Sequence, residues 1–271
     1  MDVALENYTR LPPMSRSIAT FTFVVSAGVV LGLLPVQYFI FHPFYLFKFP
    51  PQIWRLATSF FVTSPGIGLL FDTYFLYTYL CQMEVGNPRF PRKEDLLWYL
   101  MFNCGTILVT NYLTGFGFMT FLPALILAMA YTVTQEQAGA NVNYMFITMP
   151  AQFMPYAMLA INLLFPGGAM NLLLQLHGLF AGHLFDFLTK TWPNYGGGRN
   201  LIPTPAVLSR LVQSAESIIQ GRFGGPAAHS GGQRLGGNSG GGRIAPGTNT
   251  DTSGGPLPDS WRTRGPGQRL G

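Results

Sequence analysis

Six apolar segments are the feature that most constrains this chain. They span residues 17–34, 65–82, 96–113, 119–134, 147–164 and 170–189. A helix needs about 20 apolar residues to cross a hydrocarbon core of about 30 Å, and each segment has roughly 16–20. Charged residues make up only 10% of the chain. The sequence therefore predicts an all-α polytopic membrane protein with six transmembrane helices, which tilt or lie in a locally thinned bilayer.

The distribution of Lys and Arg predicts the orientation of these helices. No cleavage site of small residues follows the first apolar segment, so we expect it to be retained as a signal anchor. If the N-terminus faces the cytosol, fourteen Lys and Arg fall on the cytosolic side and only Lys48 and Arg55 on the other. The positive-inside rule then places both termini in the cytosol.

Composition divides the chain into four parts. Residues 1–16 form a polar cytosolic N-terminus, residues 17–189 the membrane domain, and residues 190–212 a juxtamembrane cytosolic segment. Residues 213–271 hold 16 of the 32 glycines and few apolar side chains. Such a segment cannot bury a core, so we expect it to be a disordered Gly- and Arg-rich tail.

The first loop, residues 35–64, is too apolar for an ordinary lumenal loop. Aromatic and aliphatic residues mix with His42, Lys48 and Arg55, and the three prolines within residues 37–61 interrupt any helix. This composition is typical of a segment in the membrane interface, where aromatic rings lie at headgroup level and cations reach water. Trp54 and Arg55 form an adjacent pair of this amphipathic kind.

The positions of serine argue against serine proteolysis. No serine lies between Ser64 and Ser209, so a Ser–His dyad cannot form within the later membrane segments. Cys81 and Cys104 leave a cysteine-type intramembrane protease as an alternative. No cluster of Cys and His has the spacing of metal ligands, and we expect neither a cofactor nor a nucleic-acid partner.

Four Asp and His residues lie within membrane segments: Asp72 in the second, and His177, His183 and Asp186 in the last. A charge at the bilayer centre costs about 2.5–3.5 kcal/mol on insertion scales, so these residues should face protein or water. Asp186 can pair with His183 or with Lys190 along one helix face. The four residues indicate either an ion pair that anchors the helix or a polar groove open to the cytosol.

Gly178 and Gly182 are four residues apart in the last apolar segment. This small-xxx-small spacing allows the backbones of two membrane helices to come into contact. We therefore expect the two glycines to be a helix-packing motif.

Four stretches in order along residues 7–212 resemble the derlin family, the rhomboid-like pseudoproteases of the endoplasmic reticulum (ER). They are QIWRLATSFF at 52–61, FLYTYLCQMEVG at 75–86, HGLFAGHLFDFL at 177–188 and GGRNLIPTPAVLSRL at 197–211. The resemblance implies a rhomboid-like fold in the ER membrane.

Individual positions match the motifs of this family. Trp54 and Arg55 resemble its first-loop motif, and Gly178 and Gly182 resemble its helix-packing motif. In active rhomboids the catalytic histidine lies three residues before the first of these glycines, where this chain has Gln175. The resemblance therefore implies a protein that is not an enzyme.

The end of the chain, WRTRGPGQRLG, looks like the short motif with which derlins recruit the AAA ATPase called valosin-containing protein. Gly265, Gly267 and Leu270 fit that pattern. Thr263 occupies its aromatic position, and Trp261 lies two residues earlier. An Arg–Gly-rich tail without this motif is the alternative.

The resemblance implies a non-catalytic role in ER-associated degradation. The protein would help to retrotranslocate misfolded lumenal or membrane proteins to the cytosol, through local membrane thinning and a cytosol-open groove. The implied partners are ER lipids, misfolded clients, a ubiquitin-ligase complex and further copies or homologues in an oligomer. A small-solute transporter or channel is the alternative that six helices permit, although no inverted repeat is visible.

Overall fold

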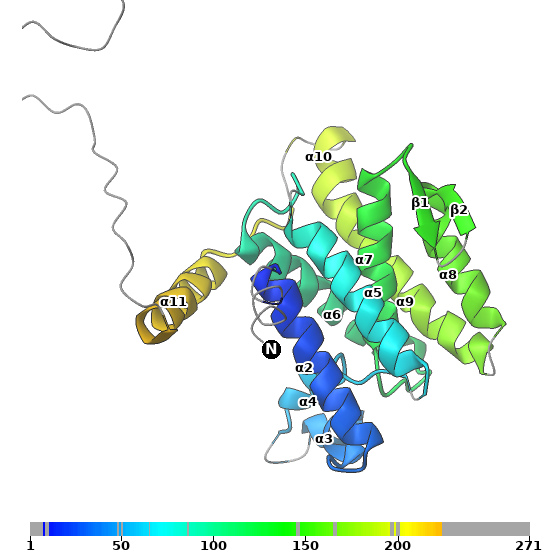
Figure 1. Ribbon diagram of the computed structural model, residues 1–271, viewed down its shortest axis with the longest axis vertical. Helices are drawn as coiled ribbons and strands as arrows, with labels where there is room; N and C mark the ends of the chain where they lie inside the picture. Colours follow the sequence, from blue (N-terminus) through cyan, green and yellow to red (C-terminus); the bar gives the residue numbers. More distant parts are fainter. Residues whose placement is uncertain are drawn as a thin grey trace, which may run out of the picture. The chain divides into compact units, whose positions relative to one another are not determined.

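The computed structural model describes residues 8, 11–47, 49, 51–64, 66–85, 87–144, 147–164, 167–195, 198 and 201–223, and it is mostly helical (Figure 1). The helices are α2 Pro13–Val30, α3 Pro43–Phe47, α4 Trp54–Thr58, α5 Gly68–Glu84, α6 Lys93–Thr114, α7 Leu122–Glu136, α8 Met154–Leu163, α9 Gly168–Asp186, α10 Trp192–Tyr195 and α11 Ala206–Phe223. Short 3-10 turns are η1 Val36–Tyr38 and η2 Ala151–Phe153, and the π-helical turn η3 Phe187–Thr191 joins α9 to α10.

Helix α7 is the centre of the membrane domain. Twelve of its 15 residues are buried, Leu122, Leu127 and Met129 completely. Helices α5, α8 and α9 all pack against it (Figure 1). A helix that is apolar on every side needs neighbours on every side, so α7 positions the others.

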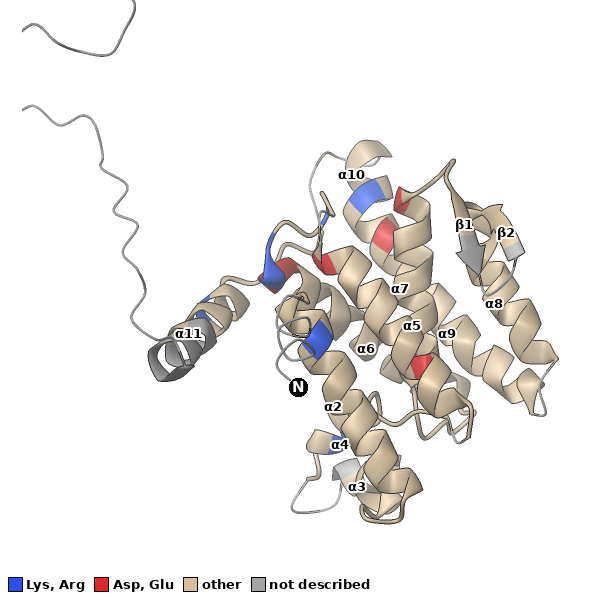
Figure 2. Cartoon of the chain, viewed as in Figure 1, with Lys and Arg blue, Asp and Glu red and all other residues tan. Residues whose placement is uncertain are grey.

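The helices run alternately between two ends of the bundle. At one end, Ser15 at the start of α2 donates from its backbone N to Glu84 at the end of α5, at 2.7 Å. At the other end, the backbone N of Phe41 donates to the carbonyl of Met119, just before α7, at 2.8 Å. Figure 2 shows most of the charged residues at the first end, which we call the charged end.

Length and composition support three membrane spans among the described residues. They are Pro13–Val30, Lys93–Thr114 and Gly168–Tyr195, which correspond to the first, third and sixth predicted segments. Helices α5 and α7 lie at the second and fourth predicted segments but have only 17 and 15 residues. The chain therefore has a helix at each of these five positions.

The fifth predicted segment, residues 147–164, is not one helix. Strand β2, Ile147–Pro150, pairs antiparallel with β1, Asn141–Tyr144, and α8 follows with only 10 residues. Pro150 ends the strand, and Pro155 lies in the first turn of α8. Backbone N–H groups in the first turn of a helix have no partner within the helix, so proline is tolerated there. The prediction of an all-α fold is wrong at this hairpin.

Helix α11 extends the juxtamembrane segment into the predicted tail. It continues to Phe223, so the start of the segment 213–271 is helical and the prediction of disorder is wrong there. Apolar residues recur at helical spacing from Val207 onward, a pattern that favours an amphipathic helix. Residues 224–271, which include the tail motif of Trp261, Gly265, Gly267 and Leu270, lie outside the described residues.

Candidate functional site

Arg55 organises the first loop from inside. It is 3% exposed, and its Nε donates to Gln52 Oε1 at 2.5 Å. Its Nη1 donates to the carbonyl of Ile40 at 2.9 Å and to that of Gln37, and the guanidinium carbon lies 4.3 Å from the ring centre of Tyr45. The guanidinium offers five donors in a rigid plane, which suits such a set of acceptors. The expectation that this cation reaches water is therefore wrong.

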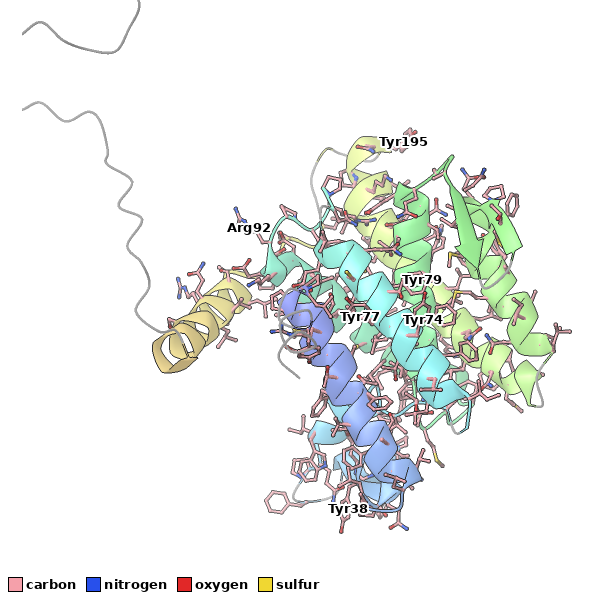
Figure 3. All side chains as sticks on the ribbon, viewed as in Figure 1. Tyr38, Tyr74, Tyr77, Tyr79, Arg92 and Tyr195 are labelled. Carbon is pink, nitrogen blue, oxygen red and sulfur yellow. The ribbon has the colours of Figure 1, made fainter. Side chains whose placement is uncertain are left out.

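The outer face of the same loop is apolar. Trp54 is 51% exposed at the start of α4. Other large apolar side chains of the loop are exposed as well: Tyr38, which is labelled in Figure 3, Phe44, Phe49 and Ile53. Pro43 begins the short helix α3, so this proline starts a helix in the loop where the sequence predicted an interruption. The loop thus combines a buried cation with an exposed aromatic face.

Gly178 and Gly182 lie where α9 meets α7. A Cβ atom added at Gly178 would be 1.9 Å from the carbonyl oxygen of Ala124. One added at Gly182 would be 3.0 Å from the carbonyl oxygen of Ala128. No side chain fits at the first distance, and the second is tight, so backbone contact between the two helices depends on these glycines.

His177 and Gln175 connect α9 to two other helices. His177 Nδ1 lies 2.7 Å from the carbonyl of Leu173, and Nε2 lies 3.0 Å from Thr114 Oγ1 at the end of α6. Because a carbonyl can only accept, Nδ1 carries a proton. The side chain of Gln175 is buried and accepts a bond from Asn162 Nδ2 of α8 at 3.1 Å. Both polar groups therefore bond to protein.

His183 and Asp186 have partners on other elements. His183 Nδ1 lies 2.8 Å from the hydroxyl of Tyr131 on α7. Asp186 forms an ion pair with Arg89, which precedes α6. The predicted pairing of Asp186 with His183 or Lys190 along one face of α9 is therefore wrong.

Arg89 joins three elements at the charged end. Besides Asp186, it approaches Glu136 of α7 to 3.7 Å, and its Nη2 donates to Thr189 Oγ1 of η3 at 2.7 Å. Asn87 Nδ2 donates to Glu136. No sequence motif marks this cluster. The two acidic residues lie near the ends of separate apolar segments, and Arg89 lies in a turn that precedes both of them in the chain.

Asp72 lies near the opposite end, close to the start of α5. Its Oδ2 accepts a bond from the backbone N of Ser64 at 3.0 Å. The four polar residues predicted for a groove therefore contact four different partners, Ser64, Thr114, Tyr131 and Arg89. In the parts of the chain that the structure describes, no three His, Cys, Asp or Glu side chains form a group that could hold a metal ion.

Comparison with known proteins finds similarity over the whole of this membrane domain. The Der1-like family model matches residues 11–206. The chain is 32% identical over 226 residues to Derlin-1 of Arabidopsis thaliana, covering 82% of this chain and 80% of that relative. It is 32% identical over 227 residues to Derlin-1 of Homo sapiens, covering 82% and 87%, and 29% identical over 219 residues to Derlin-1.1 of Zea mays, covering 78% and 86%. The resemblance seen in the sequence motifs is confirmed, and the chain belongs to the Der1-like family.

Proposed function

We propose that this protein is a non-catalytic component of ER-associated degradation that helps misfolded lumenal or membrane proteins to return to the cytosol for proteasomal degradation. The observation that carries the proposal is membership of the Der1-like family across residues 11–206. The proposal includes an ER membrane location, a rhomboid-like fold with six spans, and both termini in the cytosol.

Short helices support local thinning of the bilayer as the physical mechanism. Helix α8 has 10 residues. At 1.5 Å per residue it is about 15 Å long, roughly half of a hydrocarbon core of about 30 Å. A bilayer thins around helices that are too short for it, and thinner hydrocarbon lowers the free energy of a polar segment that crosses. The exposed aromatic face of the first loop would disturb the lipid further.

The contacts of α9 support a non-catalytic role. Gln175 occupies the position where the family resemblance implies the catalytic histidine of active rhomboids, and its amide bonds to Asn162. Both ring nitrogens of His177 are engaged, by Leu173 and by Thr114. The sequence also lacks any serine between positions 64 and 209 that could serve as a nucleophile.

The charged end of the bundle is the side that we propose to face the cytosol. Arg92, Lys190 and Arg210 are exposed there, as the positive-inside rule requires. From this side the tail would reach a ubiquitin-ligase complex and valosin-containing protein. Association with further copies or homologues would enlarge the region of thinned membrane around a client.

A translation-shutoff chase tests the proposal. Cells that lack the gene would express the wild type, Trp54→Ala or nothing, together with one misfolded lumenal and one misfolded membrane client. We expect the wild type to restore client decay. Trp54→Ala should restore it less, because this change removes an exposed ring of the first loop and none of the bonds of Arg55.

Tyr112→Ala is the matched control, since Tyr112 is an exposed aromatic residue of α6 outside the first loop. It should support decay as well as the wild type does. The abundance of each variant and the decay of a cytosolic proteasome substrate control for folding and for general degradation. Normal decay of both clients in cells without the gene would contradict the proposal.

A further inference from the structure

Helix α11 carries an exposed apolar strip. Val207 is 66% exposed and Leu211, one turn later, is 61% exposed. Leu208 and Val212 lie on the adjoining face and are half-buried, and the helix packs against α6. Arg210 is exposed on the other side of the strip. The helix therefore has one face toward protein, one exposed apolar strip and one polar face.

A hydrogen bond holds the start of α11 at the charged end. Thr204 Oγ1 donates to Asp95 Oδ1, in the first turn of α6, at 2.6 Å. The short helix α10 at the same end exposes Trp192 and Tyr195, and Figure 3 shows Tyr195 at its tip. Tryptophan and tyrosine side chains favour the headgroup layer of a membrane. Aromatic residues of this interfacial kind therefore lie at the same end of the bundle as the start of α11.

The exposed charge at this end is positive. Among the residues whose side chains the structure describes, no Asp or Glu is exposed. Asp95 and Glu84 bond to Thr204 and Ser15, and Asp186 pairs with Arg89. Exposed cations of this end include Arg92, Lys190 and Arg210. Such a surface complements anionic lipid headgroups.

We infer that α11 lies in the plane of the cytosolic headgroup layer, with Val207 and Leu211 among the acyl chains and Arg210 beside anionic lipid phosphates. An amphipathic helix with a narrow apolar strip and a basic edge binds a bilayer surface in this way. The strip consists of only two side chains, and exposed cations and the aromatic residues of α10 lie at the same end of the bundle, which favours an anionic lipid surface over a protein partner. Only the assignment of α11 to the cytosolic leaflet rests on the proposed function.

Depth-dependent fluorescence tests the inference on the full chain. In a Cys81→Ala, Cys104→Ala background, Leu211→Cys and the matched control Gln213→Cys would each carry an environment-sensitive probe. The chain would be placed in nanodiscs of phosphatidylcholine, with or without phosphatidylserine and with brominated acyl chains. We expect emission at position 211 to shift to shorter wavelength and to be quenched, more so with phosphatidylserine, while position 213 stays unquenched.

Equal quenching at both positions, or none at 211, would overturn the inference. A disulfide between two chains at position 211 would identify a second copy as the occupant and would also overturn it. Hydrogen exchange on the unaltered chain gives a second readout, in which the amides of residues 206–214 should exchange more slowly when phosphatidylserine is present. No readout depends on client decay, so failure here is distinct from failure of the proposed function.

Discussion

At the scale of single residues, Arg55 and Gly178 each meet a requirement that few other side chains could meet. Arg55 satisfies the carbonyls of Gln37 and Ile40 and the amide of Gln52 from one buried position. Gly178 leaves room for the carbonyl of Ala124. Both positions could be predicted from the sequence. The predicted role of Arg55 at the lipid surface was wrong, because the composition of an aromatic loop does not indicate which of its cations is buried.

Arg55→Lys should loosen the first loop. A lysine ammonium cannot reproduce the planar set of donors, and each buried acceptor left without a bond costs about 1–3 kcal/mol. We expect faster hydrogen exchange and faster proteolysis in residues 36–59 in detergent. Trp54→Ala, at the neighbouring exposed position, should leave both rates unchanged. A loop as protected in Arg55→Lys as in the wild type would refute the role of Arg55.

Gly178→Ala should destabilise the membrane domain. The added methyl group would meet the carbonyl of Ala124 at 1.9 Å, so α7 and α9 must separate. Overpacking of this kind costs about 1–3 kcal/mol, and more where backbone has to move. The matched control is Gly105→Ala in α6, where an added Cβ meets nothing within 4 Å. That change should be neutral or stabilising by up to about 1 kcal/mol.

Thermal unfolding in detergent compares the two glycine variants directly. We expect a lower Tm for Gly178→Ala and an unchanged or higher Tm for Gly105→Ala. Equal Tm values for the two variants would show that close contact between α7 and α9 is not required for stability.

At the scale of elements, the apolar runs predicted five of six helices, with each end correct to within a few residues. Helices α2, α5, α6, α7 and α9 lie within a few residues of the predicted segments. The prediction of a helix over the fifth segment was wrong because the run ITMP can form a strand as well as a helix. Its pairing with Asn141–Tyr144 makes it a strand. Likewise, the spacing along α9 predicted Lys190 as a partner of Asp186. In the structure the partner is Arg89, which belongs to the turn before α6.

Arg89→Gln should separate the ends of α7 and α9. Removing one partner of a buried ion pair leaves an uncompensated charge, which costs about 3–5 kcal/mol. Asp186 and Glu136 would both lose their cation. Arg92→Gln, a change at an exposed cation three residues later, should alter stability by less than about 0.5 kcal/mol. Denaturant unfolding in mixed micelles measures the free energy of unfolding of both variants. A similar loss in the two variants would contradict the role of the cluster.

At the scale of the whole membrane domain, charged side chains and helices of different length are distributed unevenly. Charged side chains gather at the end where α5 and α9 finish, and the first loop with its aromatic face lies at the other (Figure 2). Helix α8, with only 10 residues, and the hairpin before it occupy one side (Figure 1). Mismatch with the bilayer should therefore be greatest around α8 and smaller around α6, which has 22 residues.

The thickness of the bilayer should consequently control stability. In phosphatidylcholine vesicles of short, medium and long acyl chains, we expect the folded fraction after heating to be highest in the shortest. Mismatch costs fractions of a kcal/mol per Å, so a difference in thickness of about 10 Å is worth a few kcal/mol. Gly178→Ala should lower stability by the same amount in every lipid, because its effect arises within the protein. A stability maximum in the longest chains would show that α8 does not meet hydrocarbon, and the thinning mechanism would then lose its physical basis.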